Sequence, residues 1–388
     1  MTRGHVRVVA DISAHGLGHL TQIAPVLLAL HARLGNRLAL TVRTAHPPRR
    51  VAAILGMPFE TAPPPPDPGL AMTGPALVDV PATRRAYAAL HQDFSASVRT
   101  EAKRLAALSP DLLVSDVGYV GLAAAGRLGL PAVALCSLHW AEMMEAYLLR
   151  PGDRTNMDDS MADIEVKRWI ADVTAAYNGA AAFLLAAPRR QVPGLTNVRR
   201  IAPVARAAGR QKRAEILAAA GLSGNGSATT TRIGVITFGG IGGDLPTLSL
   251  PSRPGWLWIM PAALAEARLS RPGKDTPVIL PRERLAGLDF RDIVASADLV
   301  VTKTGYGTFM DCARHGTPCL FLPRPDWPEA PDLEAWITQA GLGRSVSAEA
   351  LAAGTWLDDE GFQRALPMAD LNGAQEAADF LADLLPGD

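Results

Sequence analysis

The sequence predicts an α/β protein with two doubly wound domains, each a mainly parallel sheet covered by helices on both faces. Two observations lead to this prediction. The chain has 388 residues, which is too long for one ordinary core and fits two domains of about 150 to 200 residues each. Short apolar runs rich in β-branched residues alternate with segments of helical periodicity in both halves, as expected for parallel strands joined by helices.

The first half repeats a pattern of strand, loop and helix. Apolar runs predict strands at 6–12, 38–43, 112–115, 132–136 and 182–185. Helical periodicity predicts helices at 20–33, 51–55, 87–108, 121–128 and 164–177. The stretch 62–81 is a proline-rich loop. The stretch 188–203 is rich in proline and arginine, as expected for a crossing between domains.

The same alternation returns after this crossing. Strands are predicted at 233–238, 257–260, 277–280, 299–302 and 319–322. Helices are predicted at 211–220, 290–296, 308–315 and 374–385. We therefore assign residues 1–198 to an N-terminal domain and 199–373 to a C-terminal domain. We expect the terminal helix within 374–388 to return to the N-terminal domain.

Charge and cysteine content exclude several classes of protein. Lys+Arg and Asp+Glu both number 38, so the chain lacks the broad basic field that nucleic-acid binding requires. The three cysteines have neither the number of a disulfide framework nor metal-ligand spacing. No stretch reaches the roughly 20 apolar residues of a membrane span. We expect a cytoplasmic protein with no nucleic-acid partner and no metal, and contact with a membrane surface stays open.

The first candidate site is the segment SAHGLGHL, residues 13–20, where a predicted strand gives way to a turn and then a helix. Ligands bind at this edge of doubly wound sheets. Gly16 and Gly18 permit a close backbone approach, and His15 and His19 lie four residues apart, so both imidazoles can face a cleft. The alternative is a tight turn whose histidines cap the next helix. Both interpretations stay open.

The second candidate is Asp116, which follows the apolar run of a predicted central strand and emerges at the same edge. A carboxylate there can orient an imidazole and raise its basicity, which makes a base able to take a proton from a hydroxyl. The alternative is an N-cap of the helix that starts near Tyr119 or Gly121. The sequence favours neither role.

The third candidate is VITFGGIGGD, residues 235–244, a strand followed by Gly239, Gly240, Gly242 and Gly243. Backbone N–H groups of such a loop can cradle a diphosphate. The segment is not a Walker A sequence, because the Gly-Lys-Ser/Thr ending is missing, and its glycine spacing does not fit a dinucleotide fingerprint. Its alternative is an ordinary flexible turn.

The fourth and most specific candidate is the segment 297–327, in which a buried strand ends in a TGYGT turn and a helix begins at about Thr308. The turn brings N–H and hydroxyl donors to a helix N-terminus, where the dipole favours a phosphate. Those residues are Thr304, Gly305, Tyr306, Gly307 and Thr308. Asp311, one turn into the helix, is placed to accept both hydroxyls of a ribose. The alternative is an ordinary helix with a structural aspartate.

With these motifs the chain resembles the GT-B glycosyltransferases, in particular the group of the lipid II N-acetylglucosaminyltransferase and the UDP-glycosyltransferases. The likeness is good over 297–323 and fair over 13–25 and 110–135. It implies two Rossmann-like domains facing across a cleft, with a nucleotide-sugar donor held by the C-terminal domain. The diphosphate would lie on the two glycine-containing loops and the ribose on Asp311. This acid is Asp where the family usually has Glu, and the segment 323–336 lacks the family's glutamine.

The resemblance also implies a reaction. Inverting members with a His-Asp dyad carry these residues where this chain has His19 and Asp116. Retaining members commonly have a Glu eight residues before the ribose acid, and this chain has Lys303 there. The resemblance therefore implies metal-independent transfer of a hexosyl unit with inversion, from a donor for which UDP is favoured, with no cofactor. Lys303 or Arg324 would add positive charge near the leaving group.

The acceptor is a small molecule, lipid or cofactor whose identity the sequence does not reveal. We expect it to contact the N-terminal domain, with 138–163 as one wall, including His139, Trp140 and Glu142. Two alternatives stay open for the whole chain. One is a sugar-nucleotide epimerase on the same fold, and the other is a non-catalytic nucleotide-binding scaffold.

Overall fold

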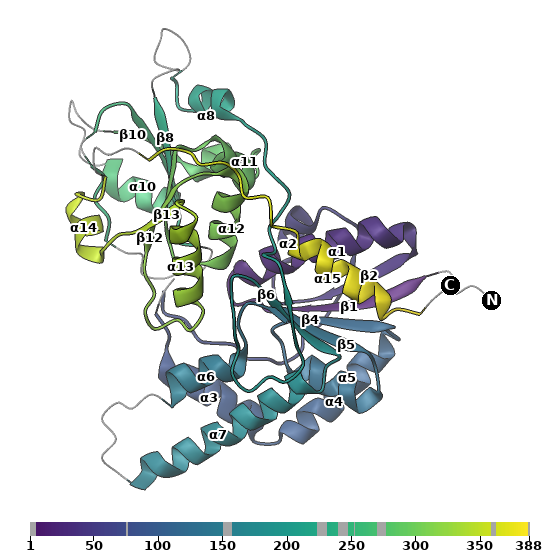
Figure 1. Cartoon of the computed structure of the whole chain (residues 1–388). Helices are drawn as coiled ribbons and strands as arrows, with labels where there is room; N and C mark the ends of the chain where they lie inside the picture. The colour runs from purple at the N-terminus through teal and green to yellow at the C-terminus, as the bar shows by residue number, and fades with distance from the viewer. Residues whose placement is uncertain are drawn as a thin grey trace.

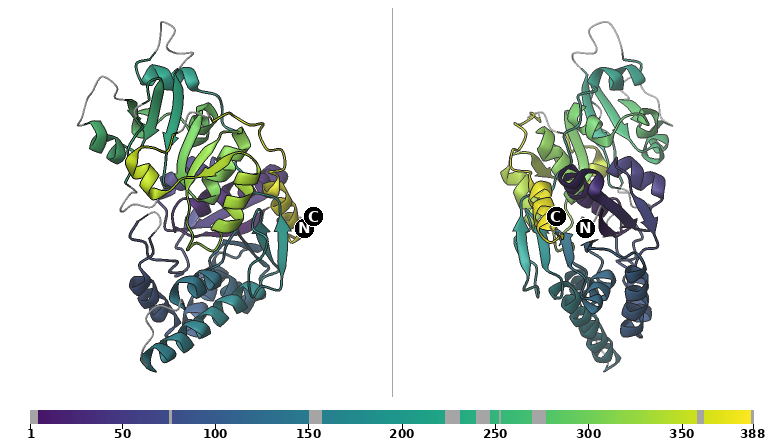
Figure 2. Two further views of the ribbon diagram at one scale, coloured as in Figure 1. Left: turned by 60° about the vertical axis from the view of Figure 1, so that its left-hand side comes forward. Right: turned by 90° about the vertical axis from the view of Figure 1, so that its right-hand side faces the viewer.

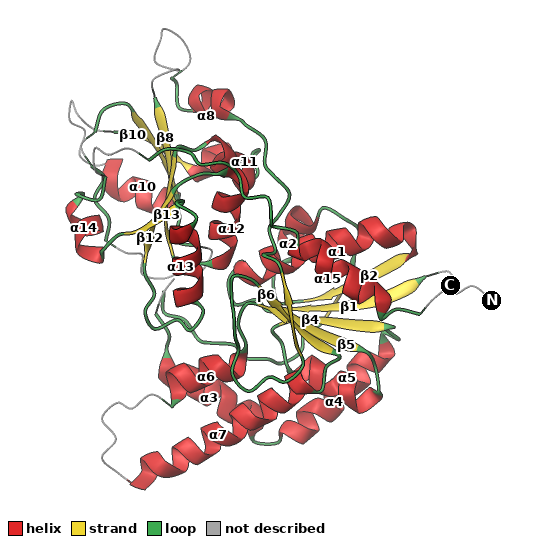
Figure 3. Ribbon diagram, in the orientation of Figure 1, coloured by secondary structure: helices red, strands yellow, loops and turns green. Residues whose placement is uncertain are grey.

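The computed structural model describes residues 5–74, 77–149, 157–222, 231–239, 247–251, 253–269, 277–357 and 362–386. These residues form two α/β lobes (Figure 1), each with one parallel sheet between layers of helices (Figure 3). The two doubly wound domains predicted from the sequence are confirmed.

The sheet of the first lobe has seven strands in the order β3-β2-β1-β4-β5-β6-β7. The strands are β1 (Val6–Ile12), β2 (Leu38–Arg43), β3 (Glu60–Ala62), β4 (Leu112–Asp116), β5 (Ala132–Cys136), β6 (Ala182–Ala186) and β7 (Val198–Ile201). The helices are α1 (Gly18–Leu34), α2 (Pro48–Leu55), α3 (Val80–His91), α4 (Phe94–Ala107), α5 (Val120–Leu128), α6 (Trp140–Leu148) and α7 (Met157–Asn178). Strands β4, β5 and β6 are buried along their whole length, as expected for parallel strands covered on both faces.

The sheet of the second lobe has six strands in the order β10-β9-β8-β11-β12-β13. The strands are β8 (Arg232–Ile236), β9 (Trp256–Met260), β10 (Val278–Pro281), β11 (Leu299–Lys303), β12 (Cys319–Leu322) and β13 (Gly343–Ser345). The helices are α8 (Arg213–Ala219), α10 (Ala262–Leu269), α11 (Phe290–Ser296), α12 (Tyr306–His315), α13 (Ala330–Gln339) and α14 (Ala348–Ala353). Gly234 in β8 leaves room for an indole, because a Cβ there would lie 2.1 Å from the Trp258 ring.

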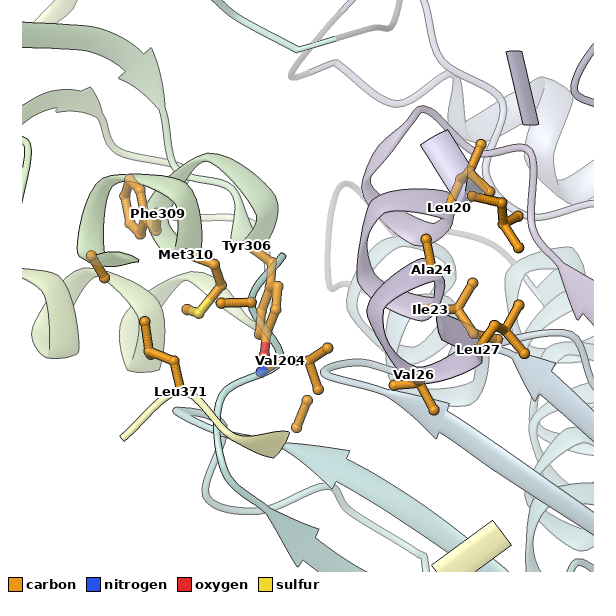
Figure 4. Packing of buried hydrophobic residues seen from close by; sticks show 14 of the residues in the cluster. Leu20, Ile23, Ala24, Val26, Leu27, Val204, Tyr306, Phe309, Met310 and Leu371 are labelled. Atoms are coloured by element: carbon orange, nitrogen blue, oxygen red, sulfur yellow. Dashed lines mark hydrogen bonds between the residues drawn. The ribbon is translucent and has the colours of Figure 1, made fainter. Parts of the chain in front are cut away.

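The lobes share a hydrophobic seam. One continuous core cluster runs from α1 and α2 of the first lobe to α8, α11, α12 and α13 of the second. At its centre, the Tyr306 hydroxyl donates to the carbonyl of Ala187, which follows β6 of the first lobe (2.9 Å), and accepts from the amide of Val204, which follows β7 at the start of the crossing (2.8 Å) (Figure 4). Burial of a large apolar side chain stabilises by about 1.5 to 3 kcal/mol, so this seam fixes how the lobes meet.

The last helix, α15 (Gly373–Asp383), leaves the second lobe and packs against α1 of the first. Arg33 and Asp379 form an ion pair across this contact, with Nη1 2.5 Å from Oδ1. Figure 2 shows α15, in yellow, lying against the first lobe. Because β7 pairs with β6, the first lobe extends a few residues beyond the predicted boundary at 198.

Three local expectations differ from the structure. The helix predicted at 87–108 is two helices, because Asp93 interrupts it and caps α4 through the Ala96 amide. The short strands β3, β7 and β13 were not predicted, since each has only three or four residues. Within the stretch 138–163, which was expected to form one wall of the acceptor site, residues 140–148 form a helix, α6, that was not predicted, and residues 150–156 lie outside the described residues.

None of the described helices combines the length and apolar character that crossing a bilayer requires.

Candidate active site

The register of the first sheet brings His19 and Asp116 together. Strands β1 and β4 are parallel neighbours, with Ile12 opposite Asp116. The segments that follow the two strands therefore leave the sheet at the same edge. The Ser13 amide donates to the Asp116 carbonyl, which keeps the loop after β1 beside the end of β4. Helix α1 begins five residues later and carries His19 in its first turn. The two residues therefore meet although 97 positions separate them.

The His19 and Asp116 side chains form a buried dyad. Nδ1 of His19 lies 3.0 Å from Oδ1 of Asp116, and the two residues are 7% and 0% exposed. Burial lowers the pKa of His19, but the Asp116 charge and hydrogen bond outweigh this effect, so the net pKa lies above its usual value. Because Nδ1 is occupied, Nε2 is the nitrogen that can exchange a proton with a ligand. The geometry is that of an imidazole base oriented by a carboxylate.

Cys136 lies next to this dyad, with its sulfur 3.8 Å from His19 Nδ1. His19, Asp116 and Cys136 offer three possible metal-ligand atoms within 4.8 Å of one another. However, burial raises the pKa of the Cys136 thiol well above its usual value, and the thiol donates to Gln22 Oε1 at 3.4 Å. The three residues and Gln22 thus form a hydrogen-bonded cluster around the base.

The alternative role considered for Asp116, an N-cap of the next helix, belongs to another residue. Asp67, from the proline-rich loop, accepts the Tyr119 and Val120 amides at 2.6 and 3.1 Å through Oδ1. These are the amides at the start of α5. No sequence pattern indicates this contact, because Asp67 lies 52 positions from Tyr119 in an irregular loop.

The two glycine-containing loops of the second lobe also follow neighbouring parallel strands and therefore lie close together. Strands β8 and β11 are neighbours, and the Thr237 amide donates to the Val301 carbonyl just beyond β8. The Lys303 side chain then lies between the two loops. A Cβ at Gly239 would lie 3.9 Å from Lys303 Nζ, and one at Gly305 would lie 3.8 Å from it. Gly240, Gly242 and Gly243 lie outside the described residues.

Lys303 is a half-buried basic residue. Burial and, to a smaller extent, the charge of Arg324 lower its pKa to about 7, whereas the charge of Glu329 acts in the opposite direction. An anion placed between the two glycine loops would restore its full charge. The structure thus joins Lys303 to both loops that the sequence assigned to a diphosphate.

The side chains of the TGYGT turn have different surroundings. The Thr304 hydroxyl donates to Glu334 on α13, and the Tyr306 hydroxyl is engaged in the seam between lobes. Gly305 is the N-cap residue of α12, and Thr308 is half-buried in its first turn. A Cβ at Gly307 would lie 3.0 Å from Thr21 Oγ1, so this glycine allows α1 to approach the turn. The backbone of the turn, rather than the Thr304 and Tyr306 hydroxyls, is available to a phosphate.

Asp311 has a partner that the sequence did not indicate. Its carboxylate accepts from Nε (3.2 Å) and Nη2 of Arg206, which lies on the crossing between lobes. Both side chains are largely buried. A ribose at this place would share the carboxylate with the guanidinium.

Residues from both lobes meet beside the dyad. The ring of His15 stacks on Trp327 of the second lobe, with centroids 6.2 Å apart, and meets the edge of Trp140 at 5.4 Å. Trp140 is fully buried, so it is a core residue rather than a stacking surface for a ligand. Burial, helped by nearby positive charges, lowers the pKa of His15 to about 3, so this imidazole is neutral.

Glu329 was not singled out by the sequence. It is 4% exposed, its Oε2 accepts from the Trp327 indole at 3.3 Å, and its Oε1 is buried without a partner. Its charge acts on both His19 and Lys303. The only sequence signal was its place in the acidic segment after β12. The site therefore contains a base from one lobe, and a cation, an acid and two glycine loops from the other.

Sequence comparisons match no protein-family model and no curated protein. Solved structures do match, over nearly the whole chain. A glycotransferase of kitacinnamycin has a TM-score of 0.63 at 16% identity, covering 98% of this chain and 100% of the other. The fold is GT-B. The calicheamicin glycosyltransferase CalG4 matches with a TM-score of 0.58 at 14% identity, covering 98% of each chain.

The glycosyltransferase VinC, solved in complex with dTDP, matches with a TM-score of 0.53 at 15% identity, covering 98% of this chain and 96% of the other. The GT-B architecture inferred from the motifs is thereby confirmed. At these identities the likeness shows the fold, and the chemistry must be argued from the residues.

Proposed function

We propose that the protein is a glycosyltransferase that moves a sugar from a nucleoside-diphosphate donor to an acceptor hydroxyl with inversion at the anomeric carbon. The observation that carries this proposal is the position of the His19–Asp116 dyad at the sheet edge of the first lobe, beside the Lys303 cation and glycine loops of the second. A base and a diphosphate site at one junction are what direct displacement requires.

In the proposed reaction, His19 Nε2 takes the proton of the acceptor hydroxyl while the oxygen bonds to the anomeric carbon. The bond between that carbon and the β-phosphate oxygen breaks, and its electron pair leaves with the nucleoside diphosphate. Asp116 stabilises the imidazolium that forms. Lys303 and the backbone amides at the start of α12 stabilise the departing charge. The scheme uses no metal.

The second lobe supplies the donor site in this proposal. The diphosphate lies between Gly239 and Gly305 against Lys303, and Asp311, held by Arg206, accepts the ribose hydroxyls. The unpartnered Oε1 of Glu329 accepts a hydroxyl of the sugar, since a buried carboxylate oxygen without a partner costs free energy that a ligand recovers. VinC, which shares the fold, was solved with dTDP, so thymine as well as uracil nucleotides belong among the candidates.

The proposal is tested by calorimetric titration with UDP, GDP, dTDP and their common sugar conjugates. We expect one nucleotide to bind selectively and to lose at least tenfold in affinity in Asp311→Ala. The selected donor is then incubated with an acceptor library, and His19→Ala should abolish transfer with nucleotide affinity unchanged. Conversion of the donor sugar without any acceptor would indicate an epimerase instead. Binding with no turnover would indicate a non-catalytic scaffold.

A further inference from the structure

A cavity of about 490 Å³ lies at the edge of the first sheet, next to the dyad. The loops after β1 and β2 and the proline-rich segment line it, and six of the lining residues are His15, His46, Arg50, Asp67, Leu70 and Met72. The His15 ring is 6.2 Å from the His19 ring, so a molecule in this cavity is close to the base. The cavity is large enough for a drug-sized ligand.

Asp67 has one carboxylate oxygen that nothing satisfies. Its Oδ1 accepts both amides at the start of α5, whereas its Oδ2 is buried without a hydrogen-bond partner. Most buried polar atoms in folded proteins have a partner, and exceptions require an explanation. A ligand that donates to Oδ2 would supply the missing partner.

The charges around Asp67 identify the kind of donor. Arg43 on β2 is 1% exposed and divides its guanidinium between Asp11 on β1, at 2.6 and 2.7 Å, and Glu101 on α4. The charges of Asp11 and Glu101 also act on Asp67. Burial raises the pKa of Asp67 to about 7, the Tyr119 and Val120 amides oppose this rise, and the charges of Asp11 and Glu101 contribute to it. Three carboxyl groups therefore outnumber the single guanidinium beside the cavity.

The basic residues Arg50 and His46 also line the cavity, and neither forms a hydrogen bond with Asp67. Arg50, on α2, is exposed, and Nε2 of His46 is paired with the Gly16 carbonyl at 3.1 Å. Burial lowers the pKa of His46, so its ring is neutral at pH 7. The nearby hydroxyl of Tyr87 on α3 is buried and uncharged.

We propose that this cavity is the acceptor site and that Asp67 selects acceptors carrying a protonated amine, which donates to Oδ2 while the apolar body of the molecule contacts Leu70 and Met72. This inference rests on the proposed function, because the ligand is an acceptor only if the protein is a glycosyltransferase. The amine adds a positive charge beside three carboxyl groups and one guanidinium, and it holds the rest of the molecule beside His19 and His15.

The test compares two probes with the same skeleton. Tyramine carries an ammonium group where tyrosol carries a hydroxyl group. Ligand-observed NMR titration of the whole chain at pH 8 should give a dissociation constant at least tenfold lower for tyramine. At pH 5.5, where Asp67 is protonated, this preference should shrink several-fold. Equal affinities at pH 8, or no binding of tyramine, would overturn the proposal without any variant being made.

Two variants complete the test. Asp67→Asn keeps an oxygen for the amides of α5 but loses the charge, and it should abolish the preference for tyramine. Glu349→Gln removes an exposed carboxylate from the second lobe and should keep that preference. A preference that survives in Asp67→Asn contradicts the role of this residue. Nucleotide titration in the same samples separates the two proposals, because selective nucleotide binding with no amine preference leaves the glycosyltransferase proposal standing.

Discussion

The guanidinium of Arg206 faces the carboxylate of Asp311, with Nε 3.2 Å from Oδ1 and Nη2 against Oδ2. The side chains are 15% and 5% exposed, and they come from the crossing between lobes and from α12. An ionised carboxylate has about four lone-pair sites, so the pair fixes the orientation of Asp311 and leaves acceptor sites for ribose hydroxyls.

Arg206→Ala should destabilise the protein by about 3 kcal/mol, because it leaves the Asp311 carboxylate buried and uncompensated. Urea unfolding measures the change. The matched control is Arg210→Ala, since Arg210 is 77% exposed and pairs with Asp292 only at 3.5 Å. Its loss should cost less than about 1 kcal/mol. Equal effects of the two substitutions would show that the Arg206 pair contributes no more than a surface pair.

The sheet edge on which the dyad lies was predictable from the sequence patterns, and the pairing of His19 with Asp116 was implied by the resemblance to GT-B enzymes. The Arg206 pair was indicated by neither. His19 and Asp116 each follow an apolar run, and the carboxyl ends of neighbouring parallel strands meet at one edge, so their order in the chain nearly determines their place. Arg206 lies in an irregular crossing, 105 positions from Asp311. No periodicity connects such a residue to its partner.

The same reason explains the other omissions. Asp67 lies in the proline-rich loop and Glu329 in the loop after β12, and neither loop has a pattern that fixes its direction. The role of Tyr306 differs from the expectation because its hydroxyl is used between lobes. Contacts between lobes depend on how the two folded lobes pack against each other. This packing is determined by the shape and chemistry of their surfaces and cannot be read from local sequence patterns.

The dyad predicts how the transfer rate depends on pH. The base must be neutral, and the pKa of His19 is raised by Asp116, so the rate should rise with pH and reach half its maximum above about 6.5. Asp116→Asn removes the charge that raises this pKa. The acidic limb should then move to lower pH, and kcat should fall by at least about 10²-fold.

A second histidine–aspartate pair in the same lobe provides the control for this profile. Nδ1 of His91 lies 3.2 Å from Oδ2 of Asp172, away from the dyad. Asp172→Asn should leave the pH profile of transfer unchanged. If Asp116→Asn kept the wild-type profile as well, His19 would not be the base.

Lys303→Ala should weaken binding of the nucleoside diphosphate at least tenfold and leave binding of the nucleoside unchanged, because the ammonium contacts only the diphosphate. The pKa of Lys303 is about 7, so wild-type affinity for the diphosphate should fall as pH rises from 7 to 9. This decline should be absent in Lys303→Ala. Calorimetry in both conditions measures it, and Lys303→Arg keeps a charge at the site. A uniform loss for nucleoside and diphosphate would contradict a phosphate contact.

Glu329→Gln tests the sugar contact. The substitution keeps the size of the side chain and removes the negative charge of the carboxylate whose Oε1 has no partner. We expect affinity for the nucleotide-sugar to fall about tenfold, which corresponds to about 1.4 kcal/mol, with affinity for the free nucleoside diphosphate unchanged. The free diphosphate serves as the internal control. An equal loss for both ligands would place Glu329 outside the sugar site.

Arg189 joins the two lobes next to the proposed sugar contact. It follows β6 and donates to Glu142 of α6 in the first lobe, and to the Pro328 carbonyl and, at 3.4 Å, Asp332 in the second. Pro328 lies between Trp327 and Glu329 in the sequence, so this arginine holds the loop that completes the site. The contact has no direct part in the chemistry.

Arg189→Ala should therefore lower kcat about tenfold, because the loop with Trp327 and Glu329 loses its connection to the first lobe and the reacting groups are held less closely. Affinity for the nucleoside diphosphate should stay the same, since Lys303 and the glycine loops belong to the second lobe alone. Arg190→Ala is the matched control, because the neighbouring side chain is exposed and only its backbone amide contacts Asp332. Steady-state kinetics of the two variants decides the matter: equal kcat values would mean that the loop keeps its position without the arginine.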